Sequence, residues 1–440
     1  MNIQKIRGTE DILPGESIKW ANLESLIRAI CKVYNFEEIK TPTFEATELF
    51  IRGVGDATDI VSKEMYTFLD KKGRSLTLRP EGTAGVVRAY IENKFYDESN
   101  YKKPAKLFYL GPMFRYERPQ KGRYREFHQF GVEVIGSNDP RVDAEVISLV
   151  FTLFNFLGLK NIKVKLNTLG DDASRVSYRE ALKEYFKKHE NELCNDCKTR
   201  LEKNPLRILD CKIDSEKDLF KNAPKIKEYL NDESNEFFKS VINELEALEI
   251  PYELDESLVR GLDYYNHIVF EIHADIEGFG VNTALCGGGR YNSLVKDLGG
   301  PDTPAIGCAF GLERLLAALD AEGIDLKGIP GIDLFLIPIG EEAKKVCSIL
   351  AYQLRTLGII VDQDYMNRSF KSQLKQADKL NARFVGILGD DELKKKVINI
   401  RDNITKKEEQ IEIQKIAIYI QKKFYKHNSE CDCDDCASQQ

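Results

Sequence analysis

The sequence predicts an α/β protein with several domains, and three observations support this prediction. Up to about residue 170, segments with apolar residues at helical spacing alternate with strand-like segments. Residues 171–255 are then rich in Lys and Glu and mostly helical in pattern. Beyond a plausible linker at residues 328–331, an alternation of apolar strands and helices starts again.

The first predicted domain combines residues 1–170 and 256–325. An amphipathic helix is expected over residues 16–35, where Leu23, Ile27 and Ile30 recur at helical spacing. Residues 60–135 are strand-rich, and residues 140–157 have one apolar helical face. Strand-like sequence resumes at residues 257–272, where we expect two strands joined by an Arg-Gly-Leu-Asp corner. Residues 171–255 are therefore interpreted as an inserted helical module.

The second predicted domain is a small α/β unit over residues 331–425. Apolar strands are expected at residues 334–337, 359–361 and 384–388, with helices at 341–357 and 370–380 between them. This order is typical of a doubly wound domain with a parallel or mixed sheet. Residues 426–440 are acidic and contain cysteines, and we expect this tail to be disordered.

Composition excludes several classes of protein. The chain has 440 residues and a net charge of −7, so any contact with RNA has to come from a local basic patch. The ten cysteines are scattered, and a core of this size needs no disulfide framework, which favours a reducing compartment. We find no secretory signal and no apolar run of transmembrane length. The expected location is the cytoplasm, with no membrane partner.

The segment from Phe108 to Gly136 is the richest in candidate functional residues. Between Arg115 and Arg125 there are five basic residues and one acid, Glu117. A basic loop between strands suits phosphate groups, although a solvated hairpin tip would look the same. In the strand that follows, the period of two places Gln129, Gly131 and Glu133 on one face. We expect the glycine to leave room for a ligand between an amide and a carboxylate, the alternative being an ordinary half-exposed strand.

Three further segments could contribute to a site. Glu81, in Arg79-Pro80-Glu81-Gly82-Thr83, could face a pocket, while Thr83 could simply cap the helix that follows. Arg260 with Tyr264 and Tyr265 offers a cation and two phenols. The glycine run at 287–289 would allow close approach of a ligand, but no GxxxxGK[ST] or GxGxxG motif is present.

Arg314 is expected near the start of a helix after the strand at residues 305–311. A cation there opposes the helix dipole, and an anionic ligand would offset that cost. The alternative is a salt bridge to a nearby acid, Glu313 or Asp302.

Together these segments resemble the class II aminoacyl-tRNA synthetases. Residues 36–42 resemble the end of motif 1, residues 114–117 with 123–133 resemble motif 2, and residues 311–314 resemble motif 3. Residues 260–265 and 288–291 resemble the two signatures of the histidyl-tRNA synthetase family. The resemblance implies an antiparallel sheet flanked by helices, a helical insertion and a C-terminal anticodon-binding α/β domain. It also implies a homodimer.

The activity implied by the resemblance is ATP-dependent conversion of L-histidine to histidyl-adenylate and transfer to the 3′ end of tRNA(His) for protein synthesis. Arg115 would bind the ATP α-phosphate and the substrate carboxylate, and Arg314 would hold the γ-phosphate. Glu117 would lie at the adenine end. Arg260 would be the catalytic arginine, neutralising charge as the carboxylate attacks phosphorus. Mg²⁺ bridging the ATP phosphates is also expected.

The resemblance implies seven histidine-binding residues, which are Glu81, Thr83, Gln129, Glu133, Tyr264, Tyr265 and Tyr291. The first three would surround the α-amino group. Glu133 and Tyr265 would bond the imidazole nitrogens, and the other two tyrosines would line the pocket.

Two other functions and one metal site are compatible with parts of the sequence. The strongest alternative is a non-catalytic, synthetase-like, histidine-binding regulatory subunit of a phosphoribosyltransferase, and a pure RNA-binding module is a weaker one. Cys194, Cys197 and Cys211 lack an obvious fourth ligand, so we expect no structural zinc. The tail cysteines at residues 431–436 match no standard zinc spacing.

Overall fold

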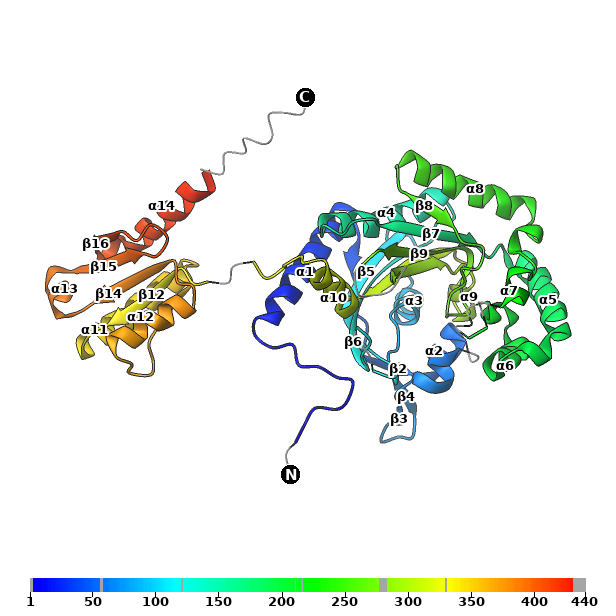
Figure 1. Cartoon of the computed structure of the whole chain (residues 1–440), viewed down its shortest axis with the longest axis horizontal. Coiled ribbons are helices and arrows are strands. Elements are labelled where there is room, and N and C mark those ends of the chain that lie inside the picture. The colour runs from blue at the N-terminus through cyan, green and yellow to red at the C-terminus, as the bar shows by residue number, and fades with distance from the viewer. Residues whose placement is uncertain are drawn as a thin grey trace. The chain divides into compact units, whose positions relative to one another are not determined.

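The computed structural model describes residues 3–55, 58–119, 122–209, 211, 213–214, 217–276, 283–328 and 331–429. The chain divides into two compact units, the first ending at Leu326 and the second beginning at Lys327 (Figure 1). Among the described residues, no helix has both the length and the apolar character that crossing a bilayer requires.

An eight-stranded sheet forms the centre of the first unit, in the order β1-β5-β6-β11-β10-β9-β7-β8. The edge pairs β1–β5 and β7–β8 are parallel, and all pairs between them are antiparallel. The large antiparallel sheet implied by the resemblance is therefore confirmed. The strands are β1 (Glu37–Glu38), β5 (Ala105–Phe114), β6 (Glu126–Ile135), β7 (Lys163–Thr168), β8 (Tyr252–Leu254), β9 (Asn266–Ala274), β10 (Thr283–Arg290) and β11 (Ala305–Gly311).

Four helices cover one face of this sheet. They are α1 (Glu16–Val33), α4 (Pro140–Phe156), α8 (Asp232–Ala247) and α10 (Leu312–Ala321). Their apolar stripes share one buried core with Phe130, Val132 and Val134 of β6. Alternation along β6 thus sends these side chains into the core and leaves Gln129 and Glu133 on the opposite face, which is the separation of faces that the period of two predicted. α4 begins where the sequence expects a start, because Asp139 accepts a hydrogen bond from the Arg141 N–H and Pro140 occupies the first turn.

The opposite face carries α3 (Thr83–Glu92), α9 (Leu294–Asp297) and a second buried cluster. Beside it lie a three-stranded sheet and two short helices: β2 (Phe44–Ala46), β3 (Thr67–Leu69), β4 (Ser75–Leu78), α2 (Thr47–Val54) and η1 (Ile60–Glu64). The expectation of two strands over residues 257–272 is wrong, because only β9 forms. Tyr264 and Tyr265 are both buried in this cluster, which the alternation of a strand would not allow for neighbouring residues.

Residues after Gly170 form a small helical module with its own core. Its elements are α5 (Asp172–Lys188), η2 (Glu190–Glu192), α6 (Asn195–Lys203), η3 (Pro205–Ile208), α7 (Asp218–Lys221) and η4 (Ile226–Glu228). The module's hydrophobic cluster extends from Tyr178 to Leu230 (green in Figure 1). α8 and β8, also within residues 171–255, pack instead with the main sheet, where Leu245 joins the large core and β8 pairs with β7.

The second unit is built on a five-stranded mixed sheet in the order β13-β12-β14-β15-β16. The second strand in this order, β12, is buried along its whole length, as its continuous apolar sequence indicates. The predicted α/β fold is confirmed. Its elements are β12 (Leu334–Pro338), α11 (Glu341–Thr356), β13 (Val361–Gln363), α12 (Phe370–Lys379), β14 (Phe384–Leu388), α13 (Asp390–Lys395), β15 (Val397–Asp402), β16 (Glu408–Glu412), η5 (Ile413–Lys415) and α14 (Ile416–Ser429). α14 continues past residue 425, and the tail cysteines lie outside the described residues.

Candidate active site

A cavity of about 660 Å³ opens on the face of the main sheet that carries α3. It adjoins a second cavity of about 310 Å³, and both are lined by Arg115, Glu117 and Arg260. The combined space is in the range of pockets that enclose a small ligand. Predicted residues that line one or both cavities are Glu81, Thr83, Arg115, Glu117, Gln129, Arg260, Tyr264, Tyr265 and Arg314.

Arg115 follows β5 directly and is fixed by the main chain. Its Nε donates a hydrogen bond of 2.7 Å to the carbonyl oxygen of Pro80. The Glu117 carboxylate lies between two guanidinium groups, 3.9 Å from Arg115 Nη1 and 3.8 Å from Arg123 Nη1. This part of the site can therefore present more than one cation to an anionic ligand while keeping a carboxylate within reach.

The Arg260 side chain is hydrogen-bonded to a residue of β9, and its guanidinium lies over Gly287 of β10. Its Nη1 donates a hydrogen bond to Glu271, whose other carboxylate oxygen is 2.9 Å from His273 Nε2. Burial favours a raised pKa for Glu271, but His273 and Arg260 outweigh it and hold the pKa below the ordinary value. A Cβ added at Gly287 would lie closer than 3.0 Å to the Arg260 guanidinium. The glycine run is thus needed here for the arginine and the neighbouring strands.

Arg314 lies in the first turn of α10 and lines the smaller cavity. Its Nε is buried and has no hydrogen-bond partner among the residues that the structure describes. Neither nearby acid pairs with it, because Glu313 accepts the His128 N–H at 2.8 Å and Asp302 forms an ion pair with Lys296. Burial, assisted by the charge of Arg123, lowers the pKa of Arg314. An anion at this helix start would stabilise the guanidinium.

The start of α3 is capped by the carboxylate of Glu81 and not by the hydroxyl of Thr83. The Glu81 carboxylate accepts hydrogen bonds of 2.8 Å from the N–H groups of both Thr83 and Ala84 at the start of α3. The Thr83 hydroxyl is therefore not the cap and instead donates a 2.7 Å hydrogen bond to Glu133. Burial raises the pKa of Glu81 in spite of these bonds.

Glu133 lies just behind the cavity wall, together with Tyr291. Only 1% of Glu133 is exposed, and its carboxyl oxygens accept hydrogen bonds from the hydroxyls of Thr83 and Tyr291. Burial raises the pKa of Glu133 to about 8 against the effect of these two bonds. A carboxyl held in this way can bond a ligand nitrogen, such as one of an imidazole ring.

The expectation that Gly131 leaves room for a ligand is wrong. Gly131 of β6 is the register partner of Tyr109 of β5, and a Cβ at Gly131 would lie closer than 3.0 Å to the Tyr109 ring. The aromatic ring thus fills the space above the glycine. The Tyr109 hydroxyl lines the larger cavity and lies 3.4 Å from Gln129 Oε1. Tyr109 and Glu271 are residues of the site that sequence reasoning missed.

The helical module also contributes to the larger cavity through Asp196, Arg200, Arg207 and Cys211. Asp59 ties the module to the main unit, since its carboxylate lies 3.6 Å from Arg200 Nη2 and 3.3 Å from Arg207 Nη2. No sequence signal connects these residues, because about 140 positions separate them along the chain. The arrangement as a whole places several guanidinium groups next to two buried carboxyls.

Comparisons with known proteins agree with this geometry. The family model described as "Histidyl-tRNA synthetase" matches residues 8–315, and "Anticodon binding domain" matches residues 333–423. A histidine--tRNA ligase of Geobacillus sp. (strain WCH70) is 56% identical over 424 residues, covering 96% of this chain and 100% of the relative.

Solved structures give the same result. The apo S. aureus histidyl-tRNA synthetase superposes with a TM-score of 0.83 at 44% identity, covering 95% of this chain and all of that one. A protein of Bacillus halodurans C, described as "ATP phosphoribosyltransferase regulatory subunit/histidyl-tRNA synthetase", shares the fold with a TM-score of 0.62 at 23% identity, covering 88% of this chain and 98% of that one. From the two family models, the identity to the full-length relative and the arrangement of the site, the chain belongs to the histidyl-tRNA synthetase family.

Proposed function

We propose that this protein activates L-histidine with ATP, forming histidyl-adenylate and releasing pyrophosphate, and then transfers the histidyl group to the 3′ end of tRNA(His) with release of AMP. The observation that carries the proposal is the placement of Arg115, Arg260 and Arg314 around two adjoining cavities. Attack of a carboxylate on the α-phosphate builds negative charge on a phosphorus centre, and fixed cations stabilise that charge.

Each arginine has a separate part in this proposal. Arg115, oriented by the Pro80 carbonyl, binds the α-phosphate and the histidine carboxylate. Arg260, oriented by Glu271, neutralises charge during the attack. Arg314, at the start of α10 in the smaller cavity, binds the γ-phosphate. Glu117 lies beside Arg115 and is assigned to the adenine end.

The histidine pocket is assigned to the deeper side of the larger cavity. Glu81, Thr83 and Gln129 line it and would surround the α-amino group. Glu133 and Tyr265 would bond the imidazole nitrogens, with Tyr264 and Tyr291 packing around the ring. In support, the rings of Tyr264 and Tyr265 lie 4.6 Å apart and those of Tyr264 and Tyr291 lie 5.6 Å apart, a compact aromatic wall.

Mg²⁺ is proposed to enter bound to the ATP phosphates, with carboxylates completing its oxygen ligands. Glu64 and Glu117 both line the larger cavity. Burial and the charge of Glu117 raise the pKa of Glu64, so a cation there would be stabilising. When bound, the ion would neutralise phosphate charge. The homodimer and the cytoplasmic location stay predictions.

The regulatory-subunit alternative is less well supported. The chain keeps Arg115, Arg260 and Arg314 around the two adjoining cavities, and residues 333–423 match an anticodon-binding domain. That domain is proposed to bind the anticodon of tRNA(His). The test is aminoacylation of a tRNA(His) transcript with labelled histidine and ATP. We expect labelled histidine on the 3′ end, with loss in Arg260→Ala. Protein that binds histidine but charges no tRNA would overturn the proposal in favour of the regulatory role.

A further inference from the structure

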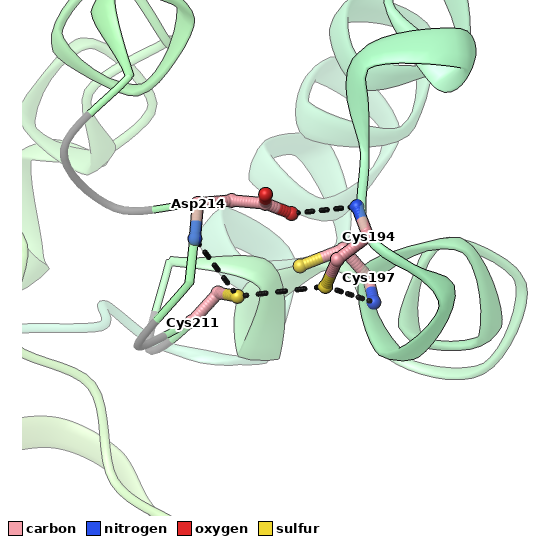
Figure 2. A group of neighbouring side chains, drawn as sticks. All are labelled: Cys194, Cys197, Cys211 and Asp214. Carbon is pink, nitrogen blue, oxygen red and sulfur yellow. Dashed lines mark hydrogen bonds between the residues drawn. The ribbon is translucent and has the colours of Figure 1, made fainter.

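Four side chains with metal-binding atoms converge inside the helical module. They are Cys194, Cys197, Cys211 and Asp214, and their sulfur and carboxylate oxygen atoms all lie within 4.8 Å of one another (Figure 2). The first two flank the start of α6, and the other two lie on the turn beyond η3. Figure 2 shows the three sulfurs and the carboxylate directed toward a shared space. Asp214 is the fourth ligand that the sequence did not reveal.

The spacing of these atoms fits a tetrahedral zinc ion. Zn–S bonds of about 2.3 Å in tetrahedral geometry place two sulfurs about 3.8 Å apart. The Sγ atoms of Cys194 and Cys211 lie 3.7 Å apart. The distance between any two ligand atoms of the four residues is at most 4.8 Å. The most widely separated atoms have to approach each other by about 1 Å to bind one ion, and rotation of a side chain supplies that movement.

The main chain around the cluster is arranged as it is around bound thiolates. The Cys197 N–H points to the Cys194 sulfur at 3.5 Å, and the Asp214 N–H points to the Cys211 sulfur at 3.3 Å. The same i to i+3 contact therefore occurs on both halves of the cluster. A third N–H, from Ile213, lies 3.4 Å from the Cys211 sulfur. Donors of this kind orient metal ligands and stabilise their charge.

Asp214 distinguishes this cluster from a group of cysteines packed only as apolar side chains. Buried cysteines are common as small apolar side chains, and Cys197 and Cys211 do belong to the module's core. A carboxylate with no exposed side-chain surface among three sulfurs needs compensation. It accepts the Cys194 N–H at 2.8 Å and pairs with Lys217, whose ammonium lies 2.7 Å away. The lysine would offset part of the excess negative charge of three thiolates and one carboxylate around a dication.

We propose that Cys194, Cys197, Cys211 and Asp214 bind one structural Zn²⁺. Three thiolates and one carboxylate form a closed four-ligand set, and soft sulfur ligands in tetrahedral arrangement select zinc over Mg²⁺ or Ca²⁺. Binding forms four protein–metal bonds and releases the thiol protons to solvent. The ion would join the start of α6 to the segment carrying Cys211, which lines the larger cavity. This proposal replaces the expectation of no zinc.

The first experiment measures zinc in the purified full chain. Because the tail also contains thiols, it uses a tail variant in which Cys431, Cys433 and Cys436 are replaced by Ser. We expect about one Zn²⁺ per chain after extensive dialysis, since a closed thiolate site holds the ion tightly. Adding Cys194→Ser and Cys197→Ser should remove it. Adding Cys347→Ser, a buried cysteine of the second unit, should leave it unchanged.

The second experiment replaces zinc by Co²⁺ and does not depend on the fold of the cysteine variants. A tetrahedral cobalt–thiolate site gives intense visible absorption, and Asp214→Asn should shift that spectrum because one oxygen ligand changes. A protein without zinc that also gives no thiolate–cobalt absorption would overturn the proposal. Zinc that persists in the Cys194→Ser, Cys197→Ser variant would do the same. A Cys194–Cys211 disulfide, found by thiol titration, would assign the cluster to redox chemistry instead.

Discussion

Adding one methyl group at Gly287 should displace the Arg260 guanidinium without unfolding the sheet. An alanine Cβ there would lie closer than 3.0 Å to three guanidinium atoms. Comfortable carbon contacts are about 3.5–4.0 Å, so these atoms have to move by roughly 1 Å. They are the far end of a flexible side chain, so the arginine moves and the strands stay in place.

The expected effect follows from that displacement. A catalytic group misplaced by about 1 Å can cost on the order of 100-fold in rate, or about 2.7 kcal/mol. Removing the cation altogether, in Arg260→Ala, should cost about 100- to 1,000-fold. Histidine-dependent ATP–pyrophosphate exchange measures both variants, with circular dichroism as the check on folding.

The double variant separates the proposed cause from other causes. If Gly287→Ala acts through Arg260, adding it to Arg260→Ala should change the exchange rate by less than about two-fold, because neighbouring residues that share one effect are not additive. An equal loss in both backgrounds would show instead that the glycine makes room for a ligand and does not act through Arg260.

Four other predictions concern three side chains. Glu133→Gln should raise the KM for histidine about 10- to 150-fold, because a bound imidazolium would hold the Glu133 carboxyl ionised in the complex and a hydrogen bond to a charged group contributes about 1.5–3 kcal/mol. Burial raises the pKa of Glu133 to about 8 from an unfolded value near 4.5, so the folded state holds the extra proton and wild type loses stability as pH rises between these values. Between pH 6 and pH 9 wild type should therefore lose about 3 kcal/mol relative to Glu133→Gln in urea titrations, and parallel curves would contradict the assignment. Arg314→Ala should raise the KM for ATP by about ten-fold or more in the exchange assay while leaving the KM for histidine unchanged; equal changes in both would remove it from the phosphate site. Arg290→Met should cost about 3–5 kcal/mol of unfolding free energy, because the fully buried Arg290 pairs with the fully buried Asp143. The control variant Arg141→Met changes an arginine on the surface and should cost less than about 0.5 kcal/mol. Similar urea midpoints for these two variants would show that the buried pair is not needed.

Local patterns predicted the elements and one face of the site. The alternation along β6 correctly separated Phe130, Val132 and Val134 from Gln129 and Glu133, because a strand facing a core leaves little freedom of register. Continuous apolar sequence correctly predicted β12, a strand of the second sheet that is buried along its whole length. Both features depend on residues within one element.

Features that depend on a partner element were missed. Gly131 was expected to make room for a ligand, but its register partner across the β5–β6 pair is Tyr109. The sequence did not indicate Asp214 as the fourth residue of the cysteine cluster, because Asp214 reaches the cysteines only through the packing of the turn after η3 against the start of α6. The spacing of residues within one element does not reveal such contacts, because the contacts depend on how separate elements pack.

The most direct test of the account is ATP–pyrophosphate exchange measured with each of the twenty amino acids in turn. We expect exchange with histidine alone, because the buried Glu133 carboxyl and the surrounding tyrosines select an imidazole, and the arginines then support adenylate formation. Exchange driven by a different amino acid would contradict the assignment of the pocket. Folded protein that binds histidine and ATP but gives no exchange would contradict the catalytic account itself.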